Sequence, residues 1–264
     1  MTTNFMDNDD EFKSYLDTAK WDSLPSEFVI FDTETTGLTP QSDRILEIGA
    51  VLFRKDDYLK TGEVTSFQCF IKQDRPIPAD ATAINGITDE MVKDGNTEYA
   101  ALTKFFDFVD GRQLYAYNAK FDSDFVRATA KRCGYLDKNF KLNVEDVLPL
   151  VGQVFDNLPN KKLATVAKHI GAPNSGAHRA INDCAMTLQV LIHCKQTLMV
   201  RDSVDAREMY LDLKRKTDEL QANLDADAAH KVAEKAKQDE NGKAVMIGIG
   251  IVILIFIFFA MTKK

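Results

Sequence analysis

EFVIFDTETTGL, residues 27–38, predicts a buried strand that ends in two acidic side chains. The run FVIF is apolar at consecutive positions, as is typical of a strand that is covered on both faces. Asp32 and Glu34 lie two residues apart, so a strand directs both carboxylates to one face. Neighbouring carboxylates repel each other unless a cation binds between them or one is protonated. Taken alone, the two residues are explained equally well as exposed loop acids, because the TTG that follows begins a turn.

Two predicted helices each add one acid to the same side of the core. Asp122 begins a helical stripe that continues through apolar residues to Cys133, and Asp183 begins a stripe of the same spacing that continues to Cys194. An unpaired buried charge is costly, and neither stripe contains Lys or Arg. Four inward carboxylates therefore predict a site for divalent metal, with Mg²⁺ or Mn²⁺ favoured over zinc. Paired ions of this kind recur in phosphodiester hydrolysis.

A histidine close to the last acid supplies a proton acceptor. His178 precedes Asp183 by five residues and follows the small polar loop 174–177. The ordinary pKa of a histidine, about 6.5, suits a general base in hydrolysis. The sequence therefore predicts four carboxylates and one histidine as the reactive groups.

The rest of residues 27–200 alternates strand and helix patterns. We predict strands at 27–33, 45–55, 64–72 and 113–117 and near 141–143, and helices at 98–110, 121–133, 144–155, 162–170 and 180–199. Three sequential strands followed by alternating helices and strands indicate an α/β fold, in which helices flank a mixed sheet. Residues 27–200 are therefore expected to form one globular domain.

Two segments outside this domain differ from it in composition. Residues 1–26 are rich in acids and are expected to be a flexible leader, in which one helical turn around Phe12–Trp21 is the alternative to a fully irregular segment. Residues 201–243 are rich in charged residues and poor in apolar ones, which predicts a solvated helical spacer. A heptad seam is suggested by the spacing of Met209, Leu213, Leu220 and Leu224, but the pattern is too short to predict a coiled coil.

The last predicted element is a membrane anchor. Residues 244–261, AVMIGIGIVILIFIFFAM, are 18 residues without a charge. A helix of that length spans roughly 27 Å, at the short end of what a bilayer requires. A buried core element is the alternative, but only the tail 262–264 follows. Because no secretory signal is recognised, we expect a single-pass, tail-anchored membrane protein whose main domain lies in the cytoplasm.

Composition argues against several classes of protein. The 264 residues include 33 Lys and Arg against 40 Asp and Glu, a net charge of −7. That balance disfavours a protein that coats long stretches of duplex, whose affinity would come from neutralising phosphates. The four cysteines form no C-x-x-C pair and fit no zinc spacing, so we interpret them as core residues in a reducing compartment.

Three short motifs resemble a known family. FDTETTGL (31–38), NAKFD (118–122) and HRAIND (178–183) are similar, in order, to the three motifs of the DnaQ-like 3′–5′ exonucleases of the DEDDh class. RILEIGAV (44–51) and IPADATAINGITDEMV (77–92) are similar to its connecting segments. One motif of five residues is weak evidence, but three in order on the predicted strand and helices are specific. The resemblance covers about residues 27–195.

The resemblance implies a ribonuclease H-like sheet and a role for each motif residue. His178 would be the general base, and Asn118 would help to position the scissile strand. Two divalent ions, Mg²⁺ with Mn²⁺ as a substitute, would be held by Asp32, Glu34, Asp122 and Asp183. The pocket for the terminal nucleotide would be lined by Thr35, Gly37 and Leu38.

Two positions depart from the family pattern. Tyr117 and Asn85 stand where the family commonly has His. Neither position is a metal ligand, so the departures bear on substrate preference rather than on activity. Cations that could guide the strand are Arg44, Lys120, Arg127, Lys161, Lys162 and Arg179, although each alone is as well explained by ordinary surface charge.

The function implied by the resemblance is removal of 5′-mononucleotides from single-stranded 3′ ends. DNA is favoured because the ITDEMV segment is similar to replication proofreading subunits, and trimming of RNA ends is the rival. A non-catalytic tethered nucleic-acid-binding module is a second alternative, and an adaptor that works through its spacer is a third. All four acids and the histidine are present, which argues against a decayed site. Residues 196–200 loosely resemble a sliding-clamp peptide, so a clamp or polymerase partner is a weaker expectation.

Overall fold

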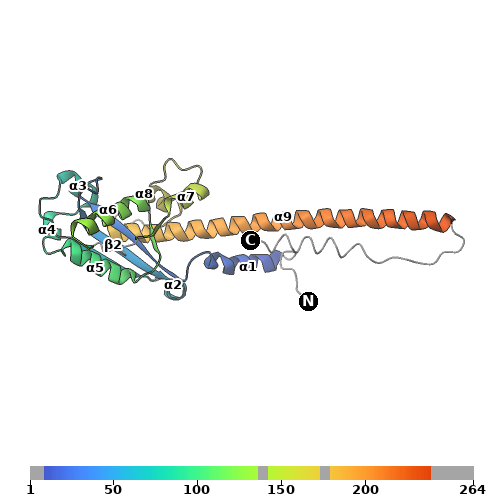
Figure 1. Ribbon diagram of the computed structural model, residues 1–264, viewed down its shortest axis with the longest axis horizontal. Helices are drawn as coiled ribbons and strands as arrows, with labels where there is room; N and C mark the ends of the chain where they lie inside the picture. The colour runs from blue at the N-terminus through green and yellow to red at the C-terminus, as the bar shows by residue number, and fades with distance from the viewer. Residues whose placement is uncertain (1–8, 136–141, 173–178, 239–264) are drawn as a thin grey trace. The chain divides into compact units, whose positions relative to one another are not determined.

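The structure is a computed structural model that describes residues 9–135, 142–172 and 179–238 (Figure 1). The chain divides into two units, residues 1–207 and 208–264. In the first unit, the described strands form one five-stranded sheet in the order β3-β2-β1-β4-β5. The strands are β1 (Glu27–Thr35), β2 (Ile45–Arg54), β3 (Thr65–Phe70), β4 (Leu114–Ala116) and β5 (Val144–Asp146).

The sheet is mixed, as the sequence predicts. β1 and β2 pair antiparallel, as do β2 and β3, whereas β4 runs parallel to both β1 and β5. The predicted strands over 27–33, 45–55 and 64–72 are confirmed with small differences at their ends. β1 therefore lies in the middle of the sheet, where strands on both sides satisfy its backbone hydrogen bonds.

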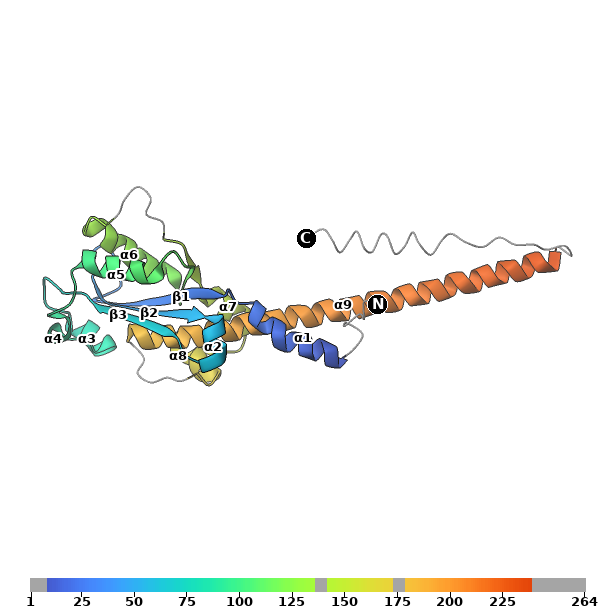
Figure 2. The same cartoon turned by 90° about the horizontal axis from the view of Figure 1, so that it is seen from below.

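Helices cover both faces of the sheet (Figure 2). Val29 and Phe31 of β1 pack with α5 (Glu98–Val109) and α6 (Ala119–Arg132). Phe28 and Ile30 instead pack with α7 (Leu148–Val154), α8 (Leu163–His169) and the first part of α9 (Ala180–Gln238). Because side chains alternate along a strand, Asp32 and Glu34 lie on the same face of β1 as Phe28 and Ile30, the face that α9 covers.

Smaller helices complete the first unit. α2 (Lys55–Thr61) follows β2 directly. α3 (Ala79–Asn85) and α4 (Asp89–Val92) form a small core of their own with Leu46 at the start of β2. The residue pattern predicts no helix in any of these three segments.

The segment around β5 corrects one prediction. Residues 144–155 were expected to form one helix, but Val144–Asp146 pair with β4 and the helix begins only at Leu148. The Asp146 carboxylate accepts hydrogen bonds from the backbone N–H groups of Asn118 and Leu148, both at 3.0 Å. Pro149 then occupies the first turn of α7, where its missing N–H costs nothing.

The leader is also more ordered than expected. Asp9–Asp22 form α1, which is longer than the single turn that the sequence suggests around Phe12–Trp21. One face of the helix supplies core residues, since Phe12 and Ala19 are buried, and the Arg207 guanidinium lies 4.7 Å from the centre of the Phe12 ring. Lys55 further pairs with Asp22 at 3.3 Å. Burial of these side chains stabilises a helix that the acidic composition of the segment does not predict.

The second unit is described as far as Gln238, where α9 ends. The helical spacer is present over 208–238, and it continues the helix that was predicted to stop at 199, because 180–238 contains neither Gly nor Pro. Met209, Leu213, Leu220 and Leu224 are exposed along it. Within the described residues no helix is both long and apolar enough to cross a bilayer, and the predicted anchor, 244–261, lies outside them.

Candidate active site

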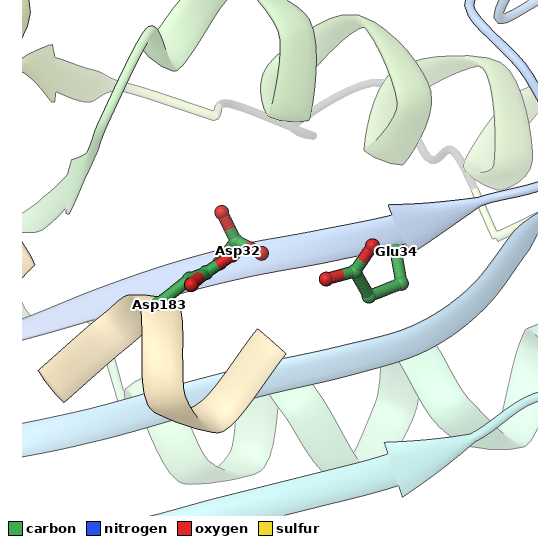
Figure 3. A group of neighbouring side chains, drawn as sticks. All are labelled: Asp32, Glu34 and Asp183. Atoms are coloured by element: carbon green, nitrogen blue, oxygen red, sulfur yellow. The ribbon is translucent and has the colours of Figure 1, made fainter. Parts of the chain in front are cut away.

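Three acids from two elements meet on the α9 face of the sheet. Asp32 and Glu34 come from the end of β1, and Asp183 comes from the first turn of α9 (Figure 3). One carboxylate oxygen from each lies within 4.8 Å of those of the other two. Glu34 is only 9% exposed, whereas Asp32 and Asp183 are partly buried. Segments far apart in the sequence thus bring their oxygen atoms together, as the sequence predicts.

The fourth predicted ligand, Asp122, is held beside this cluster by Thr33. Its side chain is 2% exposed, and its Oδ1 atom accepts hydrogen bonds from the Thr33 backbone N–H at 2.9 Å and the Thr33 hydroxyl at 2.7 Å. Burial raises the pKa of Asp122 to about 7, although these hydrogen bonds favour its ionised form. Asp122 is not among the three acids that share the 4.8 Å cluster within the described residues. It reaches the site from the opposite face of β1.

The carboxylates oppose one another's ionisation. Burial raises the pKa of Asp32 well above its usual range, and the charges of Asp122, Asp183 and Glu34 raise it further. Burial also raises the pKa of Glu34 to about 7, and the nearby Asp183 charge adds to this, while Arg179 acts in the opposite direction. Such a cluster binds protons readily when no other cation is bound.

The donor set fits divalent metal ions. All four predicted ligands are carboxylates, the ligands that Mg²⁺ and Mn²⁺ prefer, and three of them offer oxygens close enough to share an ion. Asp32, Glu34 and Asp183 would hold the ions directly, with Asp122 beside them. When bound, such ions polarise a phosphodiester and neutralise the charge that develops during its hydrolysis.

A tight loop follows β1 and leaves one large apolar side chain in solvent. The Asp43 carboxylate accepts hydrogen bonds from the Thr39 backbone N–H at 2.8 Å and from the Thr36 hydroxyl at 3.3 Å. A Cβ atom at Gly37 would lie 2.5 Å from this carboxylate, so a larger residue there would require the Asp43 side chain to move. The next residue, Leu38, is 83% exposed.

The other residues predicted to bind substrate lie around this loop. The Thr35 hydroxyl donates to the Gly37 carbonyl oxygen at 2.6 Å. Asn85, buried at the end of α3, donates its side-chain N–H to the Thr35 carbonyl oxygen at 3.3 Å. Asn118 has a left-handed backbone conformation with φ of 64° and is exposed just before α6. His178, the predicted general base, lies outside the described residues.

One feature of the site was not predicted from the sequence. Glu47 is fully buried in β2 and pairs with Arg179, so Arg179 is tied to an acid instead of being free to guide a strand. Glu47 is the single acid within an otherwise apolar strand, ILEIGAVLF, and a lone charge in such a run signals a buried partner.

Comparison with known proteins assigns the family. The family model described as exonuclease, RNase T, matches residues 29–191, which is more than half of the chain. The chain belongs to the RNase T exonuclease family. This family carries the DEDDh-type 3′–5′ exonuclease domain and uses two divalent metal ions, with which the acidic cluster is compatible.

Curated relatives of this exonuclease include bacterial replication proteins. The DNA polymerase III subunit epsilon of Treponema pallidum is 35% identical over 176 residues, which are 64% of this chain and 79% of that protein. The PolC-type DNA polymerase III of Caldanaerobacter subterraneus subsp. tengcongensis is 36% identical over 176 residues, 67% of this chain. The exonuclease chain spans only 12% of the length of that polymerase.

Solved structures support the fold. The nuclease domain of 3′hExo, a DEDDh family member bound to rAMP, has a TM-score of 0.55 and 20% identity, and covers 65% of this chain and 92% of that one. Escherichia coli exonuclease I in complex with a dT13 oligonucleotide has a TM-score of 0.55 and 21% identity, and covers 67% of this chain and 43% of that one. The predicted ribonuclease H-like mixed sheet with flanking helices is therefore confirmed.

Proposed function

We propose that this exonuclease removes 5′-mononucleotides from the 3′ ends of single-stranded DNA, with two Mg²⁺ ions as cofactors. The observation that carries the proposal is the meeting of Asp32, Glu34 and Asp183 within 4.8 Å, beside a loop that exposes Leu38. The choice of DNA is supported by the polymerase III epsilon subunit among its relatives. A polymerase or sliding-clamp partner is proposed on the same ground.

Two exposed apolar side chains support binding of a terminal nucleotide. Leu38 is 83% exposed and Ile84 is 65% exposed, next to Asn85, which holds the Thr35 carbonyl oxygen. An exposed aliphatic side chain beside a carboxylate cluster offers an apolar surface that a base can bury while its phosphate meets the metal ligands. Leu38 therefore orients the terminal base, and the hydrogen-bonded loop around Gly37 keeps Leu38 in place.

His178 acts as the general base in this proposal. It accepts the proton of the attacking water, for which an ordinary histidine pKa of about 6.5 is well suited near neutral pH. Its support is its position five residues before Asp183 in a motif similar to that of the DEDDh class.

Digestion of single strands labelled at the 5′ end tests direction and substrate together. With Mg²⁺, we expect DNA to shorten stepwise from its 3′ end and to release 5′-mononucleotides. A 3′-phosphate should slow the reaction, and RNA of the same sequence should be digested more slowly. Faster digestion of RNA would mean that RNA is the preferred substrate. Cutting of circular single strands, which have no ends, would mean that the enzyme is an endonuclease.

We also propose that residues 244–261 tether the enzyme to a membrane, with the catalytic unit on the cytoplasmic side. The support is the run of 18 uncharged, mostly apolar residues. Full-length protein should remain in the membrane fraction after carbonate extraction, whereas a variant that lacks 244–264 should be found in the supernatant with unchanged specific activity. Release of the full-length protein by carbonate would contradict the tether.

A further inference from the structure

Glu47 is a buried acid directly opposite one of the candidate metal ligands. In the antiparallel pairing of β1 and β2, Glu47 faces Glu34, so both side chains lie on the same face of the sheet. Glu47 is fully buried and is the one acid in the interior of β2. Like charges at directly opposed positions destabilise a sheet, so the charge of Glu47 requires compensation.

That compensation comes from the residues at the start of α9. The Arg179 Nη2 atom lies 3.2 Å from Glu47 Oε1, and its Nε atom lies 3.2 Å from Oε2, which gives a two-pronged ion pair. The Ala180 backbone N–H also donates to Glu47 at 3.4 Å, and the Gln68 side chain donates to it from β3. The Arg179 guanidinium lies 5.4 Å from the centre of the Phe70 ring.

The same residues set the position of a metal ligand. The Arg179 carbonyl oxygen accepts the backbone N–H groups of Asn182 at 2.8 Å and Asp183 at 3.1 Å, so it begins the turn that carries Asp183. A Cβ atom at Gly49 of β2 would lie 2.5 Å from the Ala180 carbonyl carbon. The helix start therefore rests directly on β2, and any shift of Arg179 moves the Asp183 carboxylate.

We propose that the Glu47–Arg179 ion pair is a positioning device that aligns Asp183 with Asp32 and Glu34 for divalent-metal binding. The pair fixes the first turn of α9 on β2, and neither residue is itself a metal ligand. This inference rests on the proposed function, because it assumes that the three carboxylates hold metal. It also means that Arg179 positions the first turn of α9 and does not bind the nucleic-acid strand.

Calorimetric titration of the full chain with Mn²⁺, without nucleic acid, tests this role. Glu47→Gln and Arg179→Gln are each expected to weaken Mn²⁺ binding about 10–100-fold, the usual effect of removing a group that orients a ligand. The double variant should bind no more weakly than the weaker single variant, because both changes remove the same interaction. Arg179→Lys keeps the charge but loses the two-pronged geometry, so its loss should be intermediate.

A second ion pair provides a matched control. Arg132 of α6 pairs with Glu98 of α5 in similar two-pronged geometry, with Nη2 2.6 Å from Oε1 and Nε 3.1 Å from Oε2. Arg132→Gln should lower the thermal stability of the chain without changing its Mn²⁺ affinity. If Glu47→Gln fails to fold by circular dichroism, Arg179→Lys still tests the proposal.

Kinetics separate this role from direct contact with the strand. The Mg²⁺ concentration for half-maximal activity should rise in the Glu47 and Arg179 variants, while KM for DNA and its salt dependence stay unchanged. Unchanged Mn²⁺ affinity in the folded variants would overturn the proposal, as would a wild-type chain that binds no Mn²⁺. A wild-type chain that binds Mn²⁺ but digests neither DNA nor RNA would contradict the proposed function alone.

Discussion

Asp183 lies in the first turn of α9, where its carboxylate reaches the two acids of β1. Asp32→Asn or Asp183→Asn removes one ligand charge, and metal ions supply several kcal/mol of transition-state stabilisation. We therefore expect each change to lower kcat on the order of 10³-fold or more. Asp124→Asn is the control, because Asp124 pairs with Lys120 on the surface of α6. A near-normal rate for Asp32→Asn would contradict the assignment of the ligands.

Loss of His178 should lower the rate of the reaction without weakening metal binding. His178→Ala should lower kcat roughly 10²–10⁴-fold, the usual contribution of a positioned general base. Mn²⁺ affinity, measured by calorimetry, should remain that of the wild type. A parallel loss of Mn²⁺ affinity would make His178 a metal ligand instead.

Residue patterns predicted that the acids meet, but not the contacts that support them. Asp32 and Glu34 at the end of an apolar strand fit exposed loop acids equally well, and only the inward stripes headed by Asp122 and Asp183 favour a shared site. The hydrogen bonds from Thr33 to Asp122 could not be predicted, because they depend on how α6 packs against β1. The pairing of Glu47 with Arg179 likewise depends on contact between segments far apart in the chain.

The contact between β2 and α9 leaves no room for a side chain at Gly49. Gly49→Ala would place a Cβ atom 2.5 Å from the Ala180 carbonyl carbon, so the first turn of α9 must move. Overpacking of this kind costs about 1–3 kcal/mol, and we expect a loss of activity from the displaced Asp183 as well. Chemical denaturation and initial rates measure the two effects.

Gly152 in α7 provides the matched control. A Cβ atom there would meet only the flexible end of Lys161, at 3.3 Å. Gly152→Ala should therefore be neutral or stabilising by up to about 1 kcal/mol, because alanine favours a helix interior. Equal stability and activity in the two variants would contradict the close docking of α9 on β2.

At the level of elements, periodicity predicted most of the fold. β1, α5 and α6 were predicted correctly because each buries a regular set of apolar residues within its own short stretch of sequence. The last strand was predicted near 141–143 but lies at Val144–Asp146, because three residues are too few for a period and the pairing with β4 sets its position. α1 was expected to be no more than one turn around Phe12–Trp21, because its many acids outnumber the few residues that it buries.

The whole molecule should respond to pH through its carboxylate cluster. The pKa values of Glu34 and Asp122 rise to about 7 in the folded chain, from ordinary values of 4.5 and 3.8. Between about pH 4.5 and 7 the folded state therefore holds protons that the unfolded state has released. The free energy of unfolding of the metal-free protein should fall as pH rises through this window.

Divalent metal should reverse this loss of stability. Mg²⁺ binds the ionised carboxylates of the folded state, so it should stabilise the chain more at pH 8 than at pH 5. Urea unfolding with EDTA or with Mg²⁺, at both pH values, measures the difference. Glu34→Gln should reduce the pH dependence. A metal-free stability that rises from pH 5 to 7 would contradict the account of the cluster.

The central claim is that the carboxylates of β1 and α9 hold the metal ions of a 3′–5′ exonuclease. Anomalous diffraction from crystals of the enzyme grown with Mn²⁺ and a mononucleotide tests it most directly. We predict two Mn²⁺ peaks about 3.5–4 Å apart, the separation typical of two-metal sites, bound by Asp32, Glu34 and Asp183. The absence of Mn²⁺ from these three carboxylates, in crystals that hold it elsewhere, would contradict the claim.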